Sequence, residues 1–220
     1  MLRKVPLLIP ELRAAIKAQH KESGKLLATM LMTLRGTPFI YEGQEFGMTD
    51  FDFTELSQLD DVESHNVDRV LRGLHVPRKL RWKIIRRTSR DNARTPVQWD
   101  ATAGAGFTTG KPWLGINSNY KEINCAAQEN DPDSILSYYK SLIALRRDSK
   151  ALRGGDFTAL ETGKQVFAYR RTLGSEQLTV ILNFSDKPAT CIHKGLLLKS
   201  NYPRRNFDGH LSPWEAVILK

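Results

Sequence analysis

Cysteine, metal-ligand clusters and long apolar runs are scarce or absent in this sequence, and each absence excludes a class of protein. The two cysteines, Cys125 and Cys191, lie far apart, which is typical of free thiols in a reducing compartment rather than of a disulfide scaffold. No apolar run approaches the roughly 18 residues needed to span a bilayer. No His, Cys or carboxylate cluster has the spacing of a zinc site, and the sequence predicts no metal and no cofactor.

The start of the chain and its composition favour a globular protein of the cytoplasm. Pro6 and Pro10 interrupt the apolar start, which argues against a secretory signal, and residues 11–20 are expected to form a short helix. Hydrophobic residues make up 40% and charged residues 26% of the chain, as in an ordinary folded domain. A length of 220 residues allows one large domain or two small ones. It is too short for a complete eight-unit α/β barrel of about 250 residues.

Positive charge is concentrated in one stretch. Residues 69–94, here called the basic stretch, contain ten Lys or Arg residues and a single acid, Asp91, and account for the whole net charge of +9. Such a stretch attracts phosphate groups, including those of nucleic acid. Leu80, Ile84 and Ile85 recur within it at helical spacing, and we therefore favour a solvated helix with a basic outer face.

The first part of the chain has the order of predicted elements that is typical of an α/β barrel unit. Residues 23–34 predict a helix, because leucine and methionine form a wide apolar stripe at helical spacing. Gly36 and Pro38 end it. Residues 39–41 are then expected to form a short buried strand, followed by a tight glycine-bracketed turn at residues 43–47.

The pattern changes from helical to strand-like in the last third of the chain. Asp133 is expected to cap an amphipathic helix that runs through Arg147. Predicted strands then cover residues 156–161, 165–172, 177–184, 188–193 and 214–219. A run of strands after helices indicates an α/β region followed by an all-β domain. We place the boundary near residue 150, with domains over residues 1–150 and 151–220.

The most specific motif is Arg-Asp-Asn-Ala-Arg-Thr-Pro-Val-Gln-Trp at residues 90–99, here called the signature segment. Gly-Phe-Thr-Thr-Gly-Lys-Pro-Trp follows at residues 106–113, and Gly-Thr-Pro-Phe-Ile-Tyr-Glu-Gly-Gln-Glu-Phe-Gly-Met precedes it at residues 36–48. In this order the motifs resemble bacterial α-glucosidases of the oligo-1,6-glucosidase type, in the α-amylase superfamily (glycoside hydrolase family 13). The resemblance covers residues 21–220 and implies the truncated C-terminal end of a (β/α)8 TIM barrel followed by a small antiparallel β-sandwich.

The resemblance also implies that the reacting carboxylates lie outside this chain. Retaining enzymes of this kind need a carboxylate nucleophile and a carboxylic acid about 5 Å apart. In the family these follow barrel strands four and five, and a third Asp follows strand seven in an Asn-His-Asp motif. Residues 1–20 contain neither that motif nor any Asp. We therefore assign no catalytic residue, and expect the chain alone to be inactive, to self-associate through exposed barrel surface, and to bind a small oligosaccharide only together with the missing barrel part.

The residues that remain are expected to contribute to sugar binding. The resemblance implies that Arg90 contacts the non-reducing glucose and pairs with an early-barrel Asp, and that Arg94 supports it or the neighbouring subsite. Glu45 is expected to face the second sugar. This sequence departs from the family pattern beside it, with Gln44 where a Glu is expected and Glu42 where a Gln is expected.

Several alternatives stay open at this stage. Trp99 and Trp113 are candidates for stacking on a sugar, but we favour a role in pinning their loops to the barrel. A non-enzymatic module that binds phosphate-bearing ligands or nucleic acid through the basic stretch is the second hypothesis. A piece of a trehalose-6-phosphate hydrolase is the third. The linkage cleaved, and the choice among hydrolysis, transglycosylation and isomerisation, are left undetermined.

Overall fold

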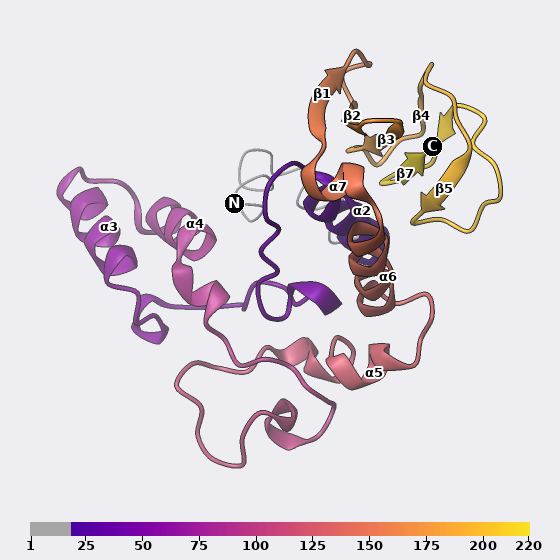
Figure 1. Cartoon of the computed structure of the whole chain (residues 1–220). Coiled ribbons are helices and arrows are strands. Elements are labelled where there is room, and N and C mark those ends of the chain that lie inside the picture. The colour runs from indigo at the N-terminus through magenta and orange to yellow at the C-terminus, as the bar shows by residue number, and fades with distance from the viewer. Residues whose placement is uncertain (1–18) are drawn as a thin grey trace. The chain divides into compact units, whose positions relative to one another are not determined.

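The computed structural model describes residues 19–220 (Figure 1), so the helix expected over residues 11–20 lies almost entirely outside the described residues. The backbone contacts divide the chain into two compact units. The first, here called the sheet unit, comprises the described residues up to Tyr41 together with Glu129–Lys220. The second, here called the loop unit, comprises Glu42–Gln128. The predicted domain boundary near residue 150 follows a different criterion, the change of sequence pattern, and stays a prediction.

The sheet unit contains two helices, α2 (His20–Thr33) and α6 (Ile135–Asp148), that form where the apolar spacing predicts them, and a short helix, α7 (Lys150–Gly154), that was not predicted. The expected cap of α6 was wrong by one residue, because the hydroxyl of Ser134 accepts the Ser137 backbone N–H at 3.0 Å. Asp133 instead accepts a hydrogen bond from the Lys25 ammonium at 2.5 Å, which leaves the capping position to its neighbour.

An antiparallel sheet follows the helices, as predicted. Its strands are β1 (Asp156–Leu160), β2 (Val166–Leu173), β3 (Glu176–Asn183), β5 (Leu197–Ser200) and β7 (Ala216–Leu219), in the order β1-β2-β3-β7-β5. A second, two-stranded sheet pairs β4 (Ala189–Thr190) with β6 (His210–Leu211). The sequence pattern located five of these strands and missed β5 and β6, which are short and rich in polar neighbours.

Strand β3 shows how the sheet is buried on both faces. Leu178, Val180 and Leu182 pack into an apolar cluster with α2, α6 and α7. Ile181 points to the opposite face, into a cluster with β7 and with Leu211 of the two-stranded sheet. Successive side chains of a strand alternate between faces, and the apolar side chains of β3 are therefore covered on both sides.

The expectation of a buried strand at residues 39–41 was wrong. These residues are not in a strand, and Phe39 is 82% exposed. Parallel barrel strands are buried because neighbouring strands and covering helices flank them. Within residues 19–220 no strand pairs with this segment, so its apolar side chains lie at the surface.

The loop unit is built from short helices and turns. Its elements are η2 (Gln44–Phe46), η3 (Leu56–Gln58), α3 (Val62–Gly73), α4 (Arg78–Thr88), η4 (Arg90–Ala93), η5 (Ala103–Gly106), η6 (Ser118–Lys121) and α5 (Cys125–Glu129). The buried apolar cluster is small and consists of Phe53, Leu59 and Ile85. The glycine-bracketed turn is confirmed: Gly43 and Gly47 flank η2 with φ of 83° and 79°, a conformation that favours glycine.

Neither a membrane-spanning helix nor a metal-binding cluster is found among the described residues. No helix within residues 19–220 is both long enough and apolar enough to cross a membrane. The same residues contain no group of three His, Cys, Asp or Glu side chains placed to hold a metal ion. Cys125 and Cys191 are both free thiols.

Candidate functional site

The signature segment starts directly after helix α4 and is organised around the buried Asp91. One carboxylate oxygen, Oδ2, accepts the backbone N–H groups of Asp60 at 2.7 Å and Asp61 at 2.9 Å. The other, Oδ1, accepts Arg94 Nη1 at 3.1 Å. Asp91 is 0% exposed, so a buried charge is matched by one guanidinium and two backbone donors. This carboxylate joins the signature segment to the chain that enters α3.

Arg90 is held by the carboxylate of Asp61, which lies at the start of α3. Its Nε and Nη2 donate to Asp61 Oδ1 at 3.0 and 2.8 Å, and its backbone N–H donates to Asp61 Oδ2 at 3.1 Å. Asp61 also caps α3 and accepts the hydroxyl of Ser64 at 3.0 Å. Burial raises the pKa of Asp61, but the hydrogen bonds from Arg90 and Ser64 outweigh it and lower the pKa to about 2. The guanidinium expected to bind glucose is therefore paired with Asp61.

The remaining polar side chains of the signature segment fasten the long loop after it. Gln98 is fully buried, and its Nε2 donates to Asn119 Oδ1 at 3.0 Å and to the Ile123 carbonyl at 2.6 Å. The indole N–H of Trp113 donates to the Asp60 carboxylate. Loop backbone that lacks regular structure needs such side-chain partners, and the hydrogen bond of Trp113 agrees with a pinning role.

A cavity of about 240 Å³ lies beside the signature segment. It is lined by one carboxylate, one guanidinium, two aromatic rings and four smaller residues: Glu42, Arg94, Phe107, Trp113, Thr95, Pro96, Val97 and Leu114. Concave sites with apolar walls and a few charged groups are typical of small-molecule binding. The structure thus brings Arg94 and Glu42 together, although these residues are far apart in the sequence.

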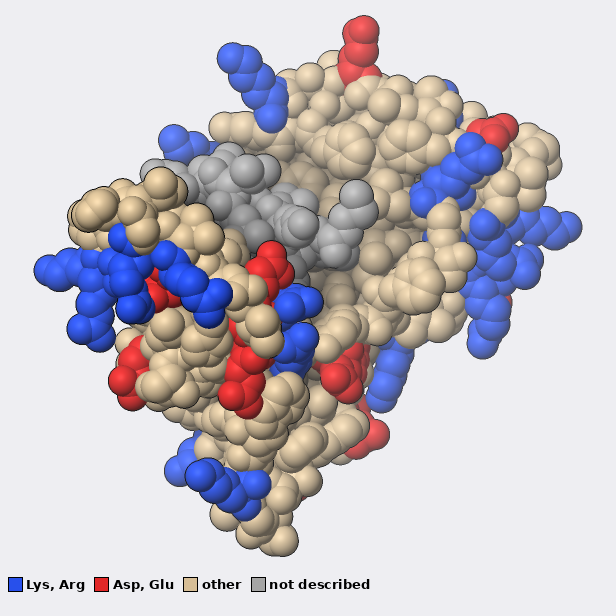
Figure 2. Space-filling view, turned by 90° about the vertical axis from the view of Figure 1, so that its left-hand side faces the viewer, with Lys and Arg blue, Asp and Glu red and all other residues tan. Residues whose placement is uncertain are grey.

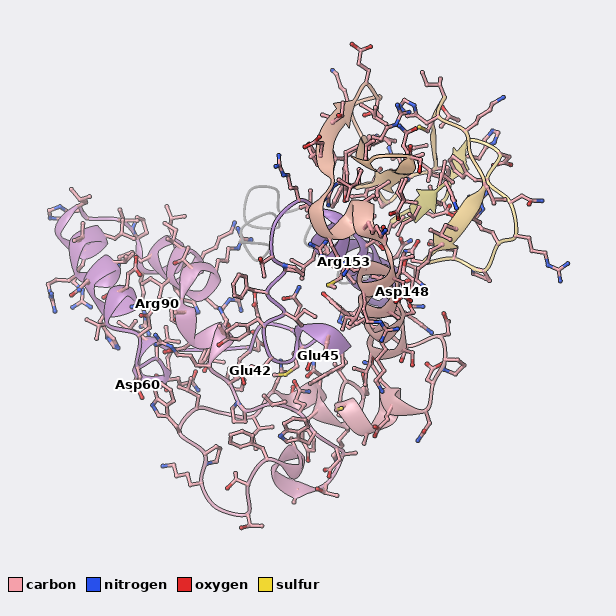
Figure 3. All side chains as sticks on the ribbon, viewed as in Figure 1. Glu42, Glu45, Asp60, Arg90, Asp148 and Arg153 are labelled. Atoms are coloured by element: carbon pink, nitrogen blue, oxygen red, sulfur yellow. The ribbon has the colours of Figure 1, made fainter. Side chains whose placement is uncertain are left out.

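The other two predicted site residues lie outside that lining. Glu45 follows Glu42 on the turn that carries η2, and Arg90 lies apart from both (Figure 3). Glu45 Oε2 is buried and has no hydrogen-bond partner among the described residues. Sequence reasoning noted Glu42 as a departure from the family pattern but assigned it no role, and it gave Phe107 none.

Half of the basic stretch is neutralised by nearby acids. The ion pairs are Arg72–Asp68, Arg81–Asp68, Arg86–Asp52, Arg90–Asp61 and Arg94–Asp91. Burial raises the pKa of Asp68, but hydrogen bonds from Arg81 and Arg72 lower it below its ordinary value. Acidic and basic side chains also lie next to each other on the face shown in Figure 2. A helix face with interspersed charges of both signs favours solvation over a phosphate-binding surface.

Comparison with known families places the chain. The model of the α-amylase catalytic domain matches residues 11–155, and the chain therefore belongs to the α-amylase family of glycoside hydrolases. The oligo-1,6-glucosidase of Parageobacillus thermoglucosidasius is 43% identical over 213 residues, which cover 90% of this chain and 38% of that protein. The glucan 1,6-α-glucosidase of Streptococcus pneumoniae serotype 4 is 38% identical, with 91% of this chain and 38% of that protein covered.

Solved structures of related enzymes agree with this assignment. The trehalulose synthase MutB of Pseudomonas mesoacidophila MX-45 superposes with a TM-score of 0.85 at 39% identity, covering 91% of this chain and 38% of that one. The isomaltulose synthase of Klebsiella sp. LX3 gives a TM-score of 0.86 at 39% identity over the same shares. The chain thus spans less than two fifths of the length of these relatives. Residues 11–155 are part of an α-amylase-type catalytic domain, and the antiparallel sheet follows this matched region.

Proposed function

We propose that this chain is the C-terminal part of an α-glucosidase that cleaves α-glucosidic bonds of small oligosaccharides, and that it supplies sugar contacts rather than the reacting carboxylates. The observation that carries the proposal is the cavity shared by Glu42, Arg94 and Trp113. The identity of about 40% with enzymes named for 1,6-glucosidic substrates supports it.

Arg94 is a better candidate than Arg90 for the glucose contact. The guanidinium of Arg90 makes two hydrogen bonds to Asp61 and does not line the cavity. Arg94 donates one N–H group to Asp91 and is one of the residues that line the cavity. Its guanidinium keeps four further donors for sugar hydroxyls. Asp91 and Asp61 then position the two arginines.

The cavity by itself cannot perform the reaction. Retention at the glucose carbon requires a nucleophilic carboxylate and a proton-donating carboxylic acid about 5 Å apart. Among the lining residues there is a single carboxyl group, that of Glu42. The second must come from elsewhere, and we propose that both reacting carboxylates are contributed by the larger part of the barrel.

The segment 39–41 is where that larger part would attach. Phe39, Ile40 and Tyr41 expose 82, 37 and 45% of their surface, and a solvent-exposed run of large apolar residues at the expected position of a barrel strand favours pairing with another strand. Alone, the chain is expected to self-associate through this segment. Sedimentation that shows a stable monomer at high concentration would contradict this expectation.

Glucose release from isomaltose and maltose tests the proposal. The purified chain is expected to release no glucose, and the Arg90→Ala variant is expected to release none either. A chimera is the informative sample: the N-terminal part of the Parageobacillus thermoglucosidasius oligo-1,6-glucosidase joined to this chain in place of its own matching segment. We expect the chimera to release glucose and to lose about 100-fold in kcat/KM on Arg94→Ala, roughly what a transition-state charge contact contributes.

Two controls separate the outcomes of that experiment. Phe107→Leu changes the cavity lining without removing a charge and is expected to act mainly on KM. Sucrose replaces isomaltose in a parallel assay, since isomeric disaccharides instead of glucose would show transfer to a sugar hydroxyl. A folded chimera that cleaves none of these substrates would refute the proposal, as would glucose release by the 220-residue chain alone.

A further inference from the structure

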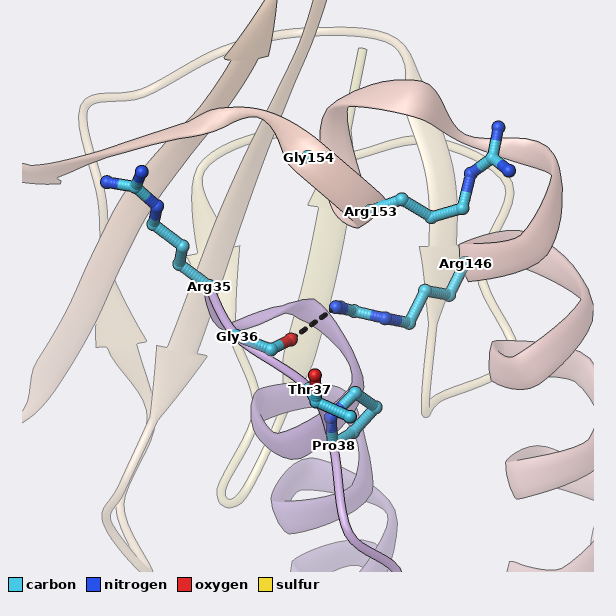
Figure 4. Close-up of a pocket in the computed structure, with 7 residues that line it drawn as sticks. All are labelled: Arg35, Gly36, Thr37, Pro38, Arg146, Arg153 and Gly154. Carbon is cyan, nitrogen blue, oxygen red and sulfur yellow. Dashed lines mark hydrogen bonds between the residues drawn. The ribbon is translucent and has the colours of Figure 1, made fainter.

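A cavity of about 500 Å³ lies in the sheet unit, where the ends of α2 and α6 meet α7. Figure 4 shows its lining, which consists of Arg35, Gly36, Thr37, Pro38, Arg146, Arg153 and Gly154. Three of these seven residues are arginines, and none is acidic. An opening with this composition is positively charged and attracts anions.

Arg146 forms the floor of the cavity and is buried. Its Nη1 donates to the carbonyls of Met32 at 2.7 Å and Leu34 at 3.3 Å, and its Nη2 donates to the Gly36 carbonyl at 2.6 Å. These bonds satisfy carbonyl groups at the C-terminal end of α2. No carboxylate pairs with it in residues 19–220, and burial lowers its pKa below the ordinary value. Among residues 19–220, two of its five N–H donors have no hydrogen-bond partner.

Arg35 and Arg153 stand on the rim, on either side of Arg146 (Figure 4). Both are exposed, and within the described part of the chain neither forms an ion pair. Asp148 interacts electrostatically with Arg153, but its carboxylate accepts a hydrogen bond from Arg147 Nε at 3.0 Å. The rim charges are therefore free to meet an anion.

A fourth arginine behind the cavity adds to the unbalanced charge. Arg171 is 0% exposed, and its guanidinium donates to the carbonyls of Thr33 at 2.6 Å and Gly155 at 2.9 Å. Burial lowers its pKa, and the charges of Arg146 and Arg35 lower it further. Like charges gathered in and around one opening repel one another, and a bound anion would relieve that repulsion.

We propose that this cavity binds a phosphate group, free or carried by a small ester, between the guanidinium groups of Arg35 and Arg153 above Arg146. Guanidinium groups match phosphate oxygens with pairs of parallel hydrogen bonds. The side chains of Arg35 and Arg153 point away from each other in Figure 4, and both are exposed and flexible enough to turn inward onto the ligand. A volume of about 500 Å³ leaves room for a small group attached to the phosphate. The proposal does not depend on the function proposed for the other cavity.

Gly154 supplies a way to close the cavity without disturbing its charges. A Cβ placed on Gly154 would meet no atom within 4 Å, and its φ lies outside the left-handed region. Gly154→Phe therefore places a ring in the opening without backbone strain. Arg146 is unsuitable as a test position, because its loss would leave three carbonyls at the end of α2 without donors.

Calorimetric titration of the full chain with inorganic phosphate at constant ionic strength tests the proposal. We expect saturable binding that weakens about tenfold in Arg35→Gln and in Arg153→Gln, as loss of one charge-assisted contact predicts, and that disappears in Gly154→Phe. Arg205→Gln is the matched control, because Arg205 is an exposed arginine of the sheet unit that lies outside the cavity lining. Its affinity should be unchanged.

A second series distinguishes the two sources of the phosphate group. The chain is titrated with glucose 6-phosphate, inorganic phosphate and glucose. Tighter binding of glucose 6-phosphate than of inorganic phosphate, with no binding of glucose at this cavity, supports a phosphate ester as the ligand. Equal affinities for the two phosphates support the free ion. Absence of saturable binding to both phosphates overturns the proposal. Equal weakening in Arg205→Gln and Arg35→Gln also overturns it, since the attraction would then be one of general charge.

Discussion

The sheet unit and the loop unit are stabilised by different kinds of contact. The sheet unit has two apolar clusters, a large one between helices α2, α6 and α7 and one face of the five-stranded sheet, and a smaller one on the opposite face. The loop unit has three buried apolar residues at its centre and relies on buried carboxylates and amides, with Asp91, Asp61 and Gln98 at the main junctions. Regular elements satisfy their own backbone groups, whereas irregular loops need side chains to do so.

This difference between apolar packing and polar junctions explains why the specific sequence motifs lie in the loop unit. Apolar contacts in a sheet tolerate many side chains of similar size. The sheet unit therefore shows a pattern of apolar and polar residues but few specific sequence motifs. Each polar junction in the loop unit needs a particular donor or acceptor at a particular place. The signature segment is specific mainly because Asp91, Asn92 and Gln98 hold loops together, while the contact with ligand is assigned to Arg94 alone.

The largest expected effect is in the apolar core of the sheet unit. Leu182→Ala removes a fully buried side chain of β3 and is expected to lower the free energy of unfolding by about 3 kcal/mol. Urea denaturation followed by circular dichroism measures this loss. Leu173→Ala, at a position that is 45% exposed at the end of β2, is the control and should cost less than about 1 kcal/mol.

A polar junction should be nearly as sensitive. Asp91→Asn keeps the shape of the side chain but removes the charge that faces Arg94 and replaces one of the two acceptor oxygens with an N–H donor group. We expect a loss of about 2 kcal/mol, since a buried partner is left unsatisfied. Hydrogen exchange of the amides of Asp60 and Asp61 is the direct measurement. Unchanged protection of these amides would show that the junction does not hold the loop unit.

The pair of Asp61 and Arg90 predicts a dependence of stability on pH. The pKa of Asp61 is about 2 in the folded chain and 3.8 ordinarily, so the unfolded chain takes up a proton first as the pH falls. The stabilisation is complete above about pH 5 and is lost as the pH falls through 4 towards 2. We expect about 1 kcal/mol, reduced by solvent around the exposed Arg90. Asp61→Asn should remove this slope from unfolding curves measured across that range.

The smallest effect is expected at the surface. Asp52 pairs with Arg86 at 3.0 Å, but its side chain is 85% exposed. Asp52→Asn should change the free energy of unfolding by less than about 0.5 kcal/mol, and it is the matched control for Asp91→Asn. A loss as large as that of Asp91→Asn would mean that burial does not separate the two kinds of carboxylate in this unit.

Much of the sheet unit could be predicted from periodicity. The helix over residues 23–34 appears as α2, and the strands β1, β2, β3 and β7 lie within two residues of their predicted bounds. The errors have local causes. Ser134 caps α6 because Asp133 is paired with lysines, and the pattern at residues 39–41 describes a strand whose pairing partners are not among the described residues.

The sequence suggested candidate residues for the site but did not predict which of them lie together. The motif drew attention to Arg90, Arg94 and Glu45, and the structure groups only Arg94 with the cavity. Both arginines have the same charge and the same motif, and nothing in the sequence distinguishes their partners. Asp61, which holds Arg90, lies 29 positions away, outside the sequence motifs.

The sequence by itself determined the family, the order of the elements and the location of the all-β region, because motifs and apolar periodicity are properties of neighbouring residues. The tertiary structure alone decided which charges meet. It paired Arg90 with Asp61, joined Arg94 to Glu42 in one cavity, and gathered Arg35, Arg146 and Arg153 around another without an acid. Such groupings depend on distances of a few ångströms between segments far apart in the chain, and Coulomb and hydrogen-bond energies vary steeply over those distances.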